Sequence, residues 1–97
     1  MKTTIIYGKT QKSANEFLYK KLEGFKYVEV DSVVKRSGEI IQFTLTNGDQ
    51  YRAVAMSESS RGMRFDKAFI EQDVDYDLFK TIISPYQIGV ETVEFFK

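Results

Sequence analysis

The chain has 97 residues, the length of one small domain, and 42% of them are apolar. Because it has no Cys, disulfides, thiolate metal sites and Cys nucleophiles are excluded; because it has no His, the commonest general base and zinc ligand are missing. Its fourteen basic and fourteen acidic side chains cancel, which argues against a nonspecific nucleic-acid coat or a membrane-surface binder. We therefore expect a single domain over residues 1–97, without metal, cofactor or enzymatic activity.

The chain also lacks the features of a secreted or membrane protein. The segment Met1–Gly8 is too short and too polar for a signal peptide. No apolar run approaches the roughly 20 residues that span a membrane. We therefore expect a cytoplasmic protein with no membrane association.

The first predicted elements are a strand and a helix. Thr3–Tyr7 is β-branched and apolar and predicts an interior strand that Gly8 ends. An apolar stripe at helical spacing predicts a helix over Ala14–Glu23. Ser13 and Glu16 have the spacing of a capping box at its start, and Gly24 suits a C-terminal position that needs a positive φ.

The next segment predicts a second strand. Tyr27–Val30 alternates between apolar and polar residues, so the sequence indicates a β-α-β unit with parallel strands. Asp31–Gly38 is polar and typical of a turn, although Val33 and Val34 are also compatible with a longer strand.

A hairpin and two further strands complete the predicted sheet. Ile40–Thr46 and Gln50–Met56 flank Asn47-Gly48, a strong hairpin signal, and Ile41, Phe43 and Leu45 are expected on one face. Ala68–Ile70 predicts a strand. Asp75 is a candidate N-cap for a short helix ended by Pro85, and Ile88–Phe96 predicts a last strand with a bulge at Gly89. The order β-α-β-β-β-β-α-β predicts an α/β or α+β fold, with a mixed sheet of about five to six strands and two helices.

A candidate phosphate site lies between the first strand and the first helix. There the backbone N–H groups and the helix dipole favour an anion. Gly8-Lys9-Thr10 matches the end of a Walker A motif, and Lys12-Ser13 is a second partial match. Both matches are incomplete, since Thr3 and Gln11 stand where glycines are required. The alternative, which we favour, is an exposed loop with two solvated lysines.

Two other charged groups are candidate contacts. Arg61 and Arg64 flank Gly62-Met63, and their planar guanidinium groups suit phosphate, nucleic acid or a protein surface. The alternative is a surface arrangement of Arg64 and Asp66, in which Gly62 supplies the turn. The acids Glu71, Asp73, Asp75 and Asp77 have a spacing that loosely fits a calcium loop. The required Gly and Glu are replaced by Tyr76 and Ile82, so we interpret the acids as helix capping and a solvated face.

In order along the chain, these pieces resemble the ATPase core of viral large terminases and related DNA translocases. The similarity extends over residues 3–73: a strand, a phosphate loop and a helix, then the Ile41–Gly48 hairpin, the serine-rich Ser57–Gly62 loop and an acidic-ended strand. Such ATPases often end this strand in Asp-Glu, the Asp serving Mg²⁺, whereas this chain has Glu71-Gln72. Because a Gln amide does not take up a proton near neutral pH, it is no general base. The resemblance implies a disabled relative of such an ATPase, of bacteriophage origin, without hydrolysis.

Together these features predict a small noncatalytic phage or prophage protein that binds and modulates a protein partner as a degenerate ATPase mimic. The first alternative is a nucleotide- or nucleic-acid-binding module that uses Gly8, Lys9, Thr10, Lys12, Ser13 and Glu71, with Arg61 and Arg64 as further contacts. The second alternative is a phage structural or assembly component.

Overall fold

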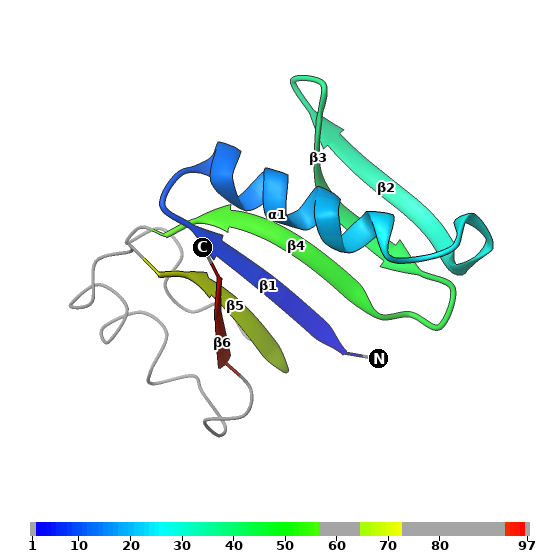
Figure 1. Ribbon diagram of the computed structural model, residues 1–97. Helices are drawn as coiled ribbons and strands as arrows, with labels where there is room; N and C mark the ends of the chain where they lie inside the picture. The colour runs from blue at the N-terminus through cyan, green and yellow to red at the C-terminus, as the bar shows by residue number, and fades with distance from the viewer. Residues whose placement is uncertain (1, 57–64, 73–92, 97) are drawn as a thin grey trace.

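The computed structural model describes residues 2–56, 65–72 and 93–96, and these form a mixed sheet with one long helix packed on it (Figure 1). The described strands make a six-stranded sheet in the order β2-β3-β4-β1-β5-β6. The predicted mixed α/β architecture is therefore confirmed. The elements are β1 (Thr3–Gly8), α1 (Gln11–Glu23), the 3-10 helix η1 (Tyr27–Glu29), β2 (Val30–Arg36), β3 (Glu39–Leu45), β4 (Gln50–Ala55), β5 (Lys67–Glu71) and β6 (Val93–Phe96).

The first strand, β1, lies inside the sheet, as its apolar sequence predicted. It pairs in parallel with β4 on one side and β5 on the other. Ile5, Ile6 and Tyr7 are almost completely buried. Because both faces and both edges of β1 are covered, every side chain from Ile5 to Tyr7 packs in a core regardless of the face to which it points.

Helix α1 starts earlier than predicted and has a different cap. It begins at Gln11, and the N-cap is Thr10, whose hydroxyl accepts a hydrogen bond from the Ser13 N–H. The predicted capping box of Ser13 and Glu16 is therefore wrong, because the first turn of the helix already includes Ser13. Gly24 ends the helix, but its φ of −77° is right-handed, so the predicted positive φ is also wrong.

The segment after α1 also differs from its prediction. Residues 27–29 form η1 rather than a strand, because the Glu29 side chain turns back and its Oε1 accepts the Lys26 N–H at 2.9 Å. The strand instead covers Val30–Arg36, most of which was predicted as a turn. β2 runs in the same direction as β1, since β1 and β4 are parallel and two antiparallel pairings separate β4 from β2. The β-α-β unit is therefore parallel in direction, but its two strands are not neighbours.

Two hairpins join the antiparallel strands. The predicted one links β3 and β4 around Asn47 and Gly48, and Gly48 has a φ of +96°. The other links β2 and β3 through Ser37 and Gly38, both with positive φ. A register shift near Ile41 lets Ile40, rather than the predicted Ile41, pack towards the helix-side core.

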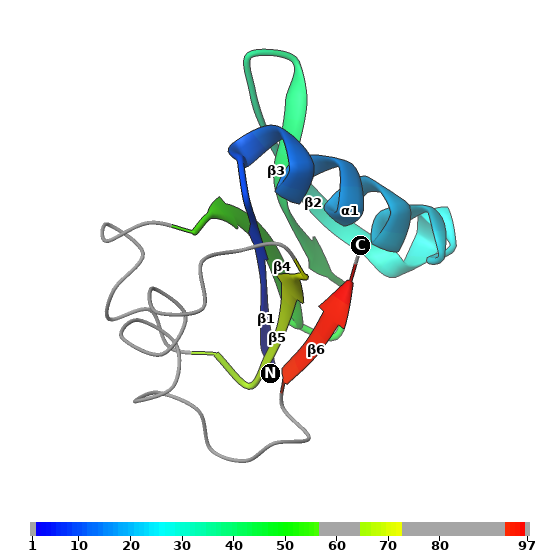
Figure 2. The same ribbon diagram turned by 60° about the vertical axis from the view of Figure 1, so that its left-hand side comes forward.

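The sheet has a buried cluster on each face, and α1 covers one of them (Figure 2). The cluster beneath α1 consists of Ile6, Ala14, Leu18, Phe43, Leu45, Ala53 and Phe69. The opposite face carries Ile5, Tyr7, Met56, Phe65, Ala68 and Ile70. On the helix side, Phe17 stacks on Phe96 with ring centroids 3.9 Å apart, so the final described strand is tied to α1.

The predicted helix that starts near Asp75 and ends at Pro85, and the residue Gly89, lie outside the described residues. The predicted last strand is described over Val93–Phe96, where it pairs in parallel with β5.

Candidate functional site

The candidate phosphate residues that the structure describes gather at one edge of the sheet. Gly8 is the last residue of β1, Lys9 and Thr10 form the connection, and Lys12 and Ser13 lie in the first turn of α1. Glu71 is the last residue of the adjacent strand β5. Because β1 and β5 are parallel neighbours, their carboxyl ends lie at the same end of the sheet. Open α/β sheets usually bind ligands at the carboxyl ends of their strands.

The Glu71 carboxylate is hydrogen-bonded to the connection between β1 and α1. Its Oε1 accepts the main-chain N–H of Lys9 at 2.7 Å. A carboxylate in this place takes the role of an anion near the positive end of the helix dipole. The Lys9 N–H, the first backbone donor after β1, is therefore already engaged by an internal carboxylate.

Thr10, Ser13 and Gly8 also have structural roles in this connection. The hydroxyls of Thr10 and Ser13 lie 3.0 Å apart, and Thr10 Oγ1 also accepts the Ser13 N–H. A Cβ atom at Gly8 would lie 2.6 Å from the nitrogen of Ala14, so glycine is required there by the close approach of β1 and α1. Only Lys9 and Thr10 separate the strand from the helix. Such a short connection lacks the long loop of N–H groups that surrounds a phosphate in a P-loop.

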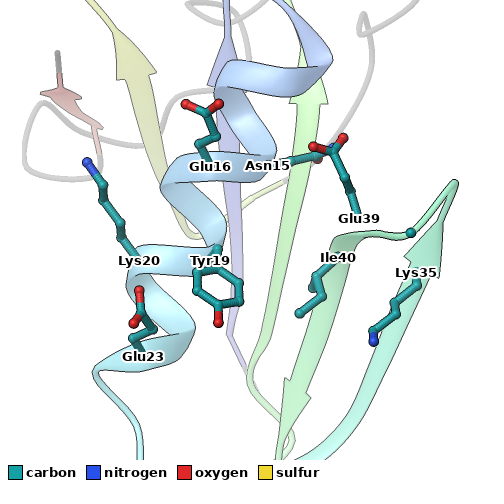
Figure 3. A pocket seen from close by; sticks show the side chains of 9 residues that line it. Asn15, Glu16, Tyr19, Lys20, Glu23, Lys35, Glu39 and Ile40 are labelled. Atoms are coloured by element: carbon teal, nitrogen blue, oxygen red, sulfur yellow. The ribbon is translucent and has the colours of Figure 1, made fainter.

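A second candidate site is a groove of about 530 Å³ between α1 and the β2–β3 hairpin (Figure 3). Tyr19 on α1 and Ile40 on β3 lie on opposite sides of this groove, and Tyr19 is 53% exposed. Charged side chains of both signs surround this aromatic centre. The lining residues are Asn15, Glu16, Tyr19, Lys20, Glu23, Lys35, Gly38, Glu39 and Ile40.

A chain of hydrogen bonds holds one end of this groove in place. Asn15, which is buried, donates from Nδ2 to Glu39 Oε2 at 3.1 Å. Gln11 donates from Nε2 both to Asn15 Oδ1 at 2.9 Å and to the carbonyl of Ala53 at 3.0 Å. The amides thus fasten α1 to β3 and β4, so that the groove has a fixed wall.

Sequence reasoning did not identify this groove. The available signal was Asn15, a polar residue next to Ala14 and three positions before Leu18, the two buried apolar residues of α1. A polar side chain on a buried helix face needs a partner. Its partner Glu39 lies 24 residues away, and no local pattern indicated it.

Arg61 and Arg64, the predicted contact residues, lie outside the described residues, and so do Asp73, Asp75 and Asp77. Within residues 2–56, 65–72 and 93–96, no group of three or more acidic, His or Cys side chains is arranged to hold a metal ion. The same part of the chain contains no helix with the length and apolar character needed to cross a membrane.

Neither a comparison with models of known protein families nor one with curated proteins finds a match for this chain.

Proposed function

We propose that this chain is a noncatalytic module that binds and modulates a protein partner through the groove beside α1. The observation that carries this proposal is the half-exposed Tyr19 ring in a groove whose wall is fixed by the Asn15–Glu39 hydrogen bond. Tyrosine is enriched among the residues that dominate binding energy, because it offers a large apolar ring with a polar tip.

The charges around Tyr19 suit a protein surface. Glu16, Lys20 and Glu23 lie on the helix side of the groove, and Lys35 and Glu39 lie on the side of the β2–β3 hairpin, so each side carries both signs (Figure 3). A rim with both signs complements a partner that also carries both signs, and such complementarity supplies specificity. A polyanion such as nucleic acid would instead favour a uniformly basic surface.

We further propose that the chain is phage- or prophage-encoded and mimics the ATPase core that it resembles. The support is the order of the resembling segments along the chain. In addition, the Lys9–Glu71 hydrogen bond lies between the first strand and the first helix, where such an ATPase has its phosphate loop. A mimic of this kind competes for a protein that docks on the ATPase and needs no nucleotide of its own.

The partner-binding proposal is tested by photo-crosslinking in the cells that carry the gene. A photoreactive phenylalanine analogue at Tyr19 is expected to give a discrete crosslinked protein, whereas the same analogue at Tyr27, which is 93% exposed and outside the groove, is not. With the captured protein purified, Tyr19→Ala should weaken binding by about tenfold or more, and Tyr27→Ala should not. Equal crosslinking from both positions, or none from Tyr19, would contradict the proposal.

A nucleotide-binding module is the second candidate, because Gly8, Lys9 and Glu71 meet at the carboxyl edge of the sheet. A ligand that binds only the folded state raises the melting temperature. We expect no rise with millimolar Mg-ATP, since Glu71 already accepts the N–H of Lys9 and Thr10 already accepts the N–H of Ser13. A rise that Lys9→Ala or Lys12→Ala removes would favour the nucleotide candidate instead.

A further inference from the structure

Strand β2 forms one edge of the sheet (Figure 1). Among the described strands it has a single neighbour, β3, so one side of its backbone faces away from the sheet. Two consecutive β-branched residues at its centre, Val33 and Val34, are 39% and 45% exposed. An edge of this kind is a template for pairing with another strand.

The charges along β2 have opposite signs at its two ends. Asp31 lies near the start, Lys35 lies near the end, and Val33 is midway between them. All three residues line hollows on the helix side of the sheet, Asp31 and Val33 beside Phe25 and Lys35 beside Tyr19. Val33 pairs with Phe43 and Lys35 pairs with Ile40, which both belong to the cluster beneath α1, so these two side chains lie on the helix side of the sheet. Asp31 lies at a register shift between Val30 and Ser32, and it lines the same hollow as Val33.

We propose that β2 pairs antiparallel with β2 of a second copy of this chain, about a two-fold axis through Val33. This register places Asp31 of each copy opposite Lys35 of the other, so that two pairs of opposite charge form. A two-fold axis perpendicular to the sheet leaves each side chain on its own face of the sheet. Each odd-numbered residue must therefore oppose an odd-numbered residue, and each even-numbered residue an even-numbered one. Within β2, Val30–Arg36, moving the axis to Ser32 or Val34 places neither Asp31 nor Lys35 opposite a residue of opposite charge.

The same register also covers the exposed apolar residues. Val33 meets its own copy across the axis, and Val34 meets Ser32 on the other face. Cross-strand pairs of β-branched residues and of opposite charges both stabilise antiparallel sheets. This inference shares Lys35 with the groove proposal, but it concerns pairing along the outward backbone of β2, and its test measures self-association rather than binding of a different protein.

Sedimentation equilibrium from micromolar to millimolar concentration tests the assembly. Wild-type protein is expected to form a dimer. Asp31→Lys and Lys35→Asp should each raise the dissociation constant by about tenfold or more, because each places like charges opposite one another twice. An equimolar mixture of the two variants should associate again. The Lys introduced at position 31 of one variant then faces the Asp introduced at position 35 of the other, and the native Lys35 of the first faces the native Asp31 of the second.

The double variant, with Asp31→Lys and Lys35→Asp in one chain, should also restore the dimer and serves if either single variant is poorly folded. As a control, Lys12→Asp on α1 makes the same charge change as Lys35→Asp and should leave the dissociation constant of the dimer unchanged. A wild-type chain that stays monomeric throughout would overturn the proposal and would mean that the charges protect the edge from pairing. A dimer that neither charge variant weakens would overturn it as well.

A cysteine crosslink tests the register. The chain has no Cys, so Val33→Cys supplies a unique thiol on the proposed axis. Directly opposed antiparallel residues have Cα atoms about 4.5–5.5 Å apart, within the range that a disulfide bridges. Val33→Cys should therefore form a disulfide-linked dimer under mild oxidation. Val34→Cys, whose copies are diagonal and roughly 7–8 Å apart, should crosslink poorly; the reverse order would exclude this register.

Discussion

The main-chain N–H of Lys9 donates a 2.7 Å hydrogen bond to Oε1 of Glu71, although the two residues lie 62 positions apart in the chain. The bond joins the turn after β1 to the end of β5. It places a carboxylate at the start of α1, where a helix favours negative charge. Glu71 thus stabilises the connection between β1 and α1.

Removal of the Glu71 side chain should destabilise the fold. Glu71→Ala leaves the Lys9 N–H without its acceptor, and we expect the free energy of unfolding to fall by about 1–2 kcal/mol. Glu71→Gln keeps a neutral acceptor oxygen and should lose less. Urea unfolding measures both, with Glu16→Ala, an exposed carboxylate on α1, as the control. If Glu71→Ala costs no more than Glu16→Ala, the hydrogen bond contributes nothing to stability.

Gly8 should tolerate no side chain. An added Cβ would lie 2.6 Å from the Ala14 nitrogen and 2.8 Å from the Thr10 carbonyl oxygen, and both neighbours are backbone atoms that cannot rotate away. We expect Gly8→Ala to cost about 2 kcal/mol or more, because the strand and the helix must separate.

The matched control for this substitution is Gly24→Ala at the other end of α1. Its φ of −77° suits alanine, and its nearest neighbour would be the Lys21 carbonyl oxygen at 3.3 Å. Its effect on the free energy of unfolding should be within about 0.5 kcal/mol. A similar loss in both variants would show that the close approach at Gly8 is not the cause.

The parts of the fold that depend on local signals could be predicted from the sequence. The strand β1 and the Asn47-Gly48 hairpin both appear as predicted. Burial on both faces requires a continuous apolar run in β1, and the positive φ of the turn favours glycine, so both features can be recognised in a short stretch of sequence. The strand at Ala68–Ile70 was also predicted, since its short apolar run is bounded by charged residues.

The parts that failed depend on side chains folding back or on distant partners. Residues 27–29 alternate as a strand does, but the Glu29 carboxylate caps its own segment at Lys26 and makes a 3-10 turn. Val33 and Val34 become an edge strand only because β3 is available to pair with them. The Asn15–Glu39 contact of the groove likewise needs the tertiary arrangement, which no local pattern contains.

Tyr7 provides a test of the buried face opposite α1. Its side chain is fully buried, its ring meets Phe65 edge-on with centroids 6.3 Å apart, and its hydroxyl finds no hydrogen-bond partner among the described residues. Burial raises the pKa of Tyr7 from 10.0 to about 12, because it disfavours the phenolate, while the charge of Arg52 acts in the opposite direction.

This raised pKa predicts a loss of stability at alkaline pH. In the unfolded chain a tyrosine ionises near pH 10, whereas Tyr7 in the folded chain keeps its proton to about pH 12. Between these values the unfolded state loses its proton first. The stability that the raised pKa of Tyr7 contributes is therefore fully present below pH 10, and it is lost as the pH rises towards 12. Tyr7→Phe removes the ionisable group and should make the free energy of unfolding fall less steeply over this interval.

Tyr7→Phe should also be no less stable than the wild type at neutral pH, and more stable by up to about 1 kcal/mol, because it removes a buried hydroxyl without a partner. Urea unfolding at neutral pH and between pH 10 and 12 measures both effects. Tyr19→Phe, at an exposed ring, is the control and should follow the wild type. Tyr51, whose pKa is raised by burial and by Asp49, remains in both variants, so the difference reports Tyr7 alone. A marked loss of neutral stability in Tyr7→Phe would show that the hydroxyl has a partner that stabilises the fold.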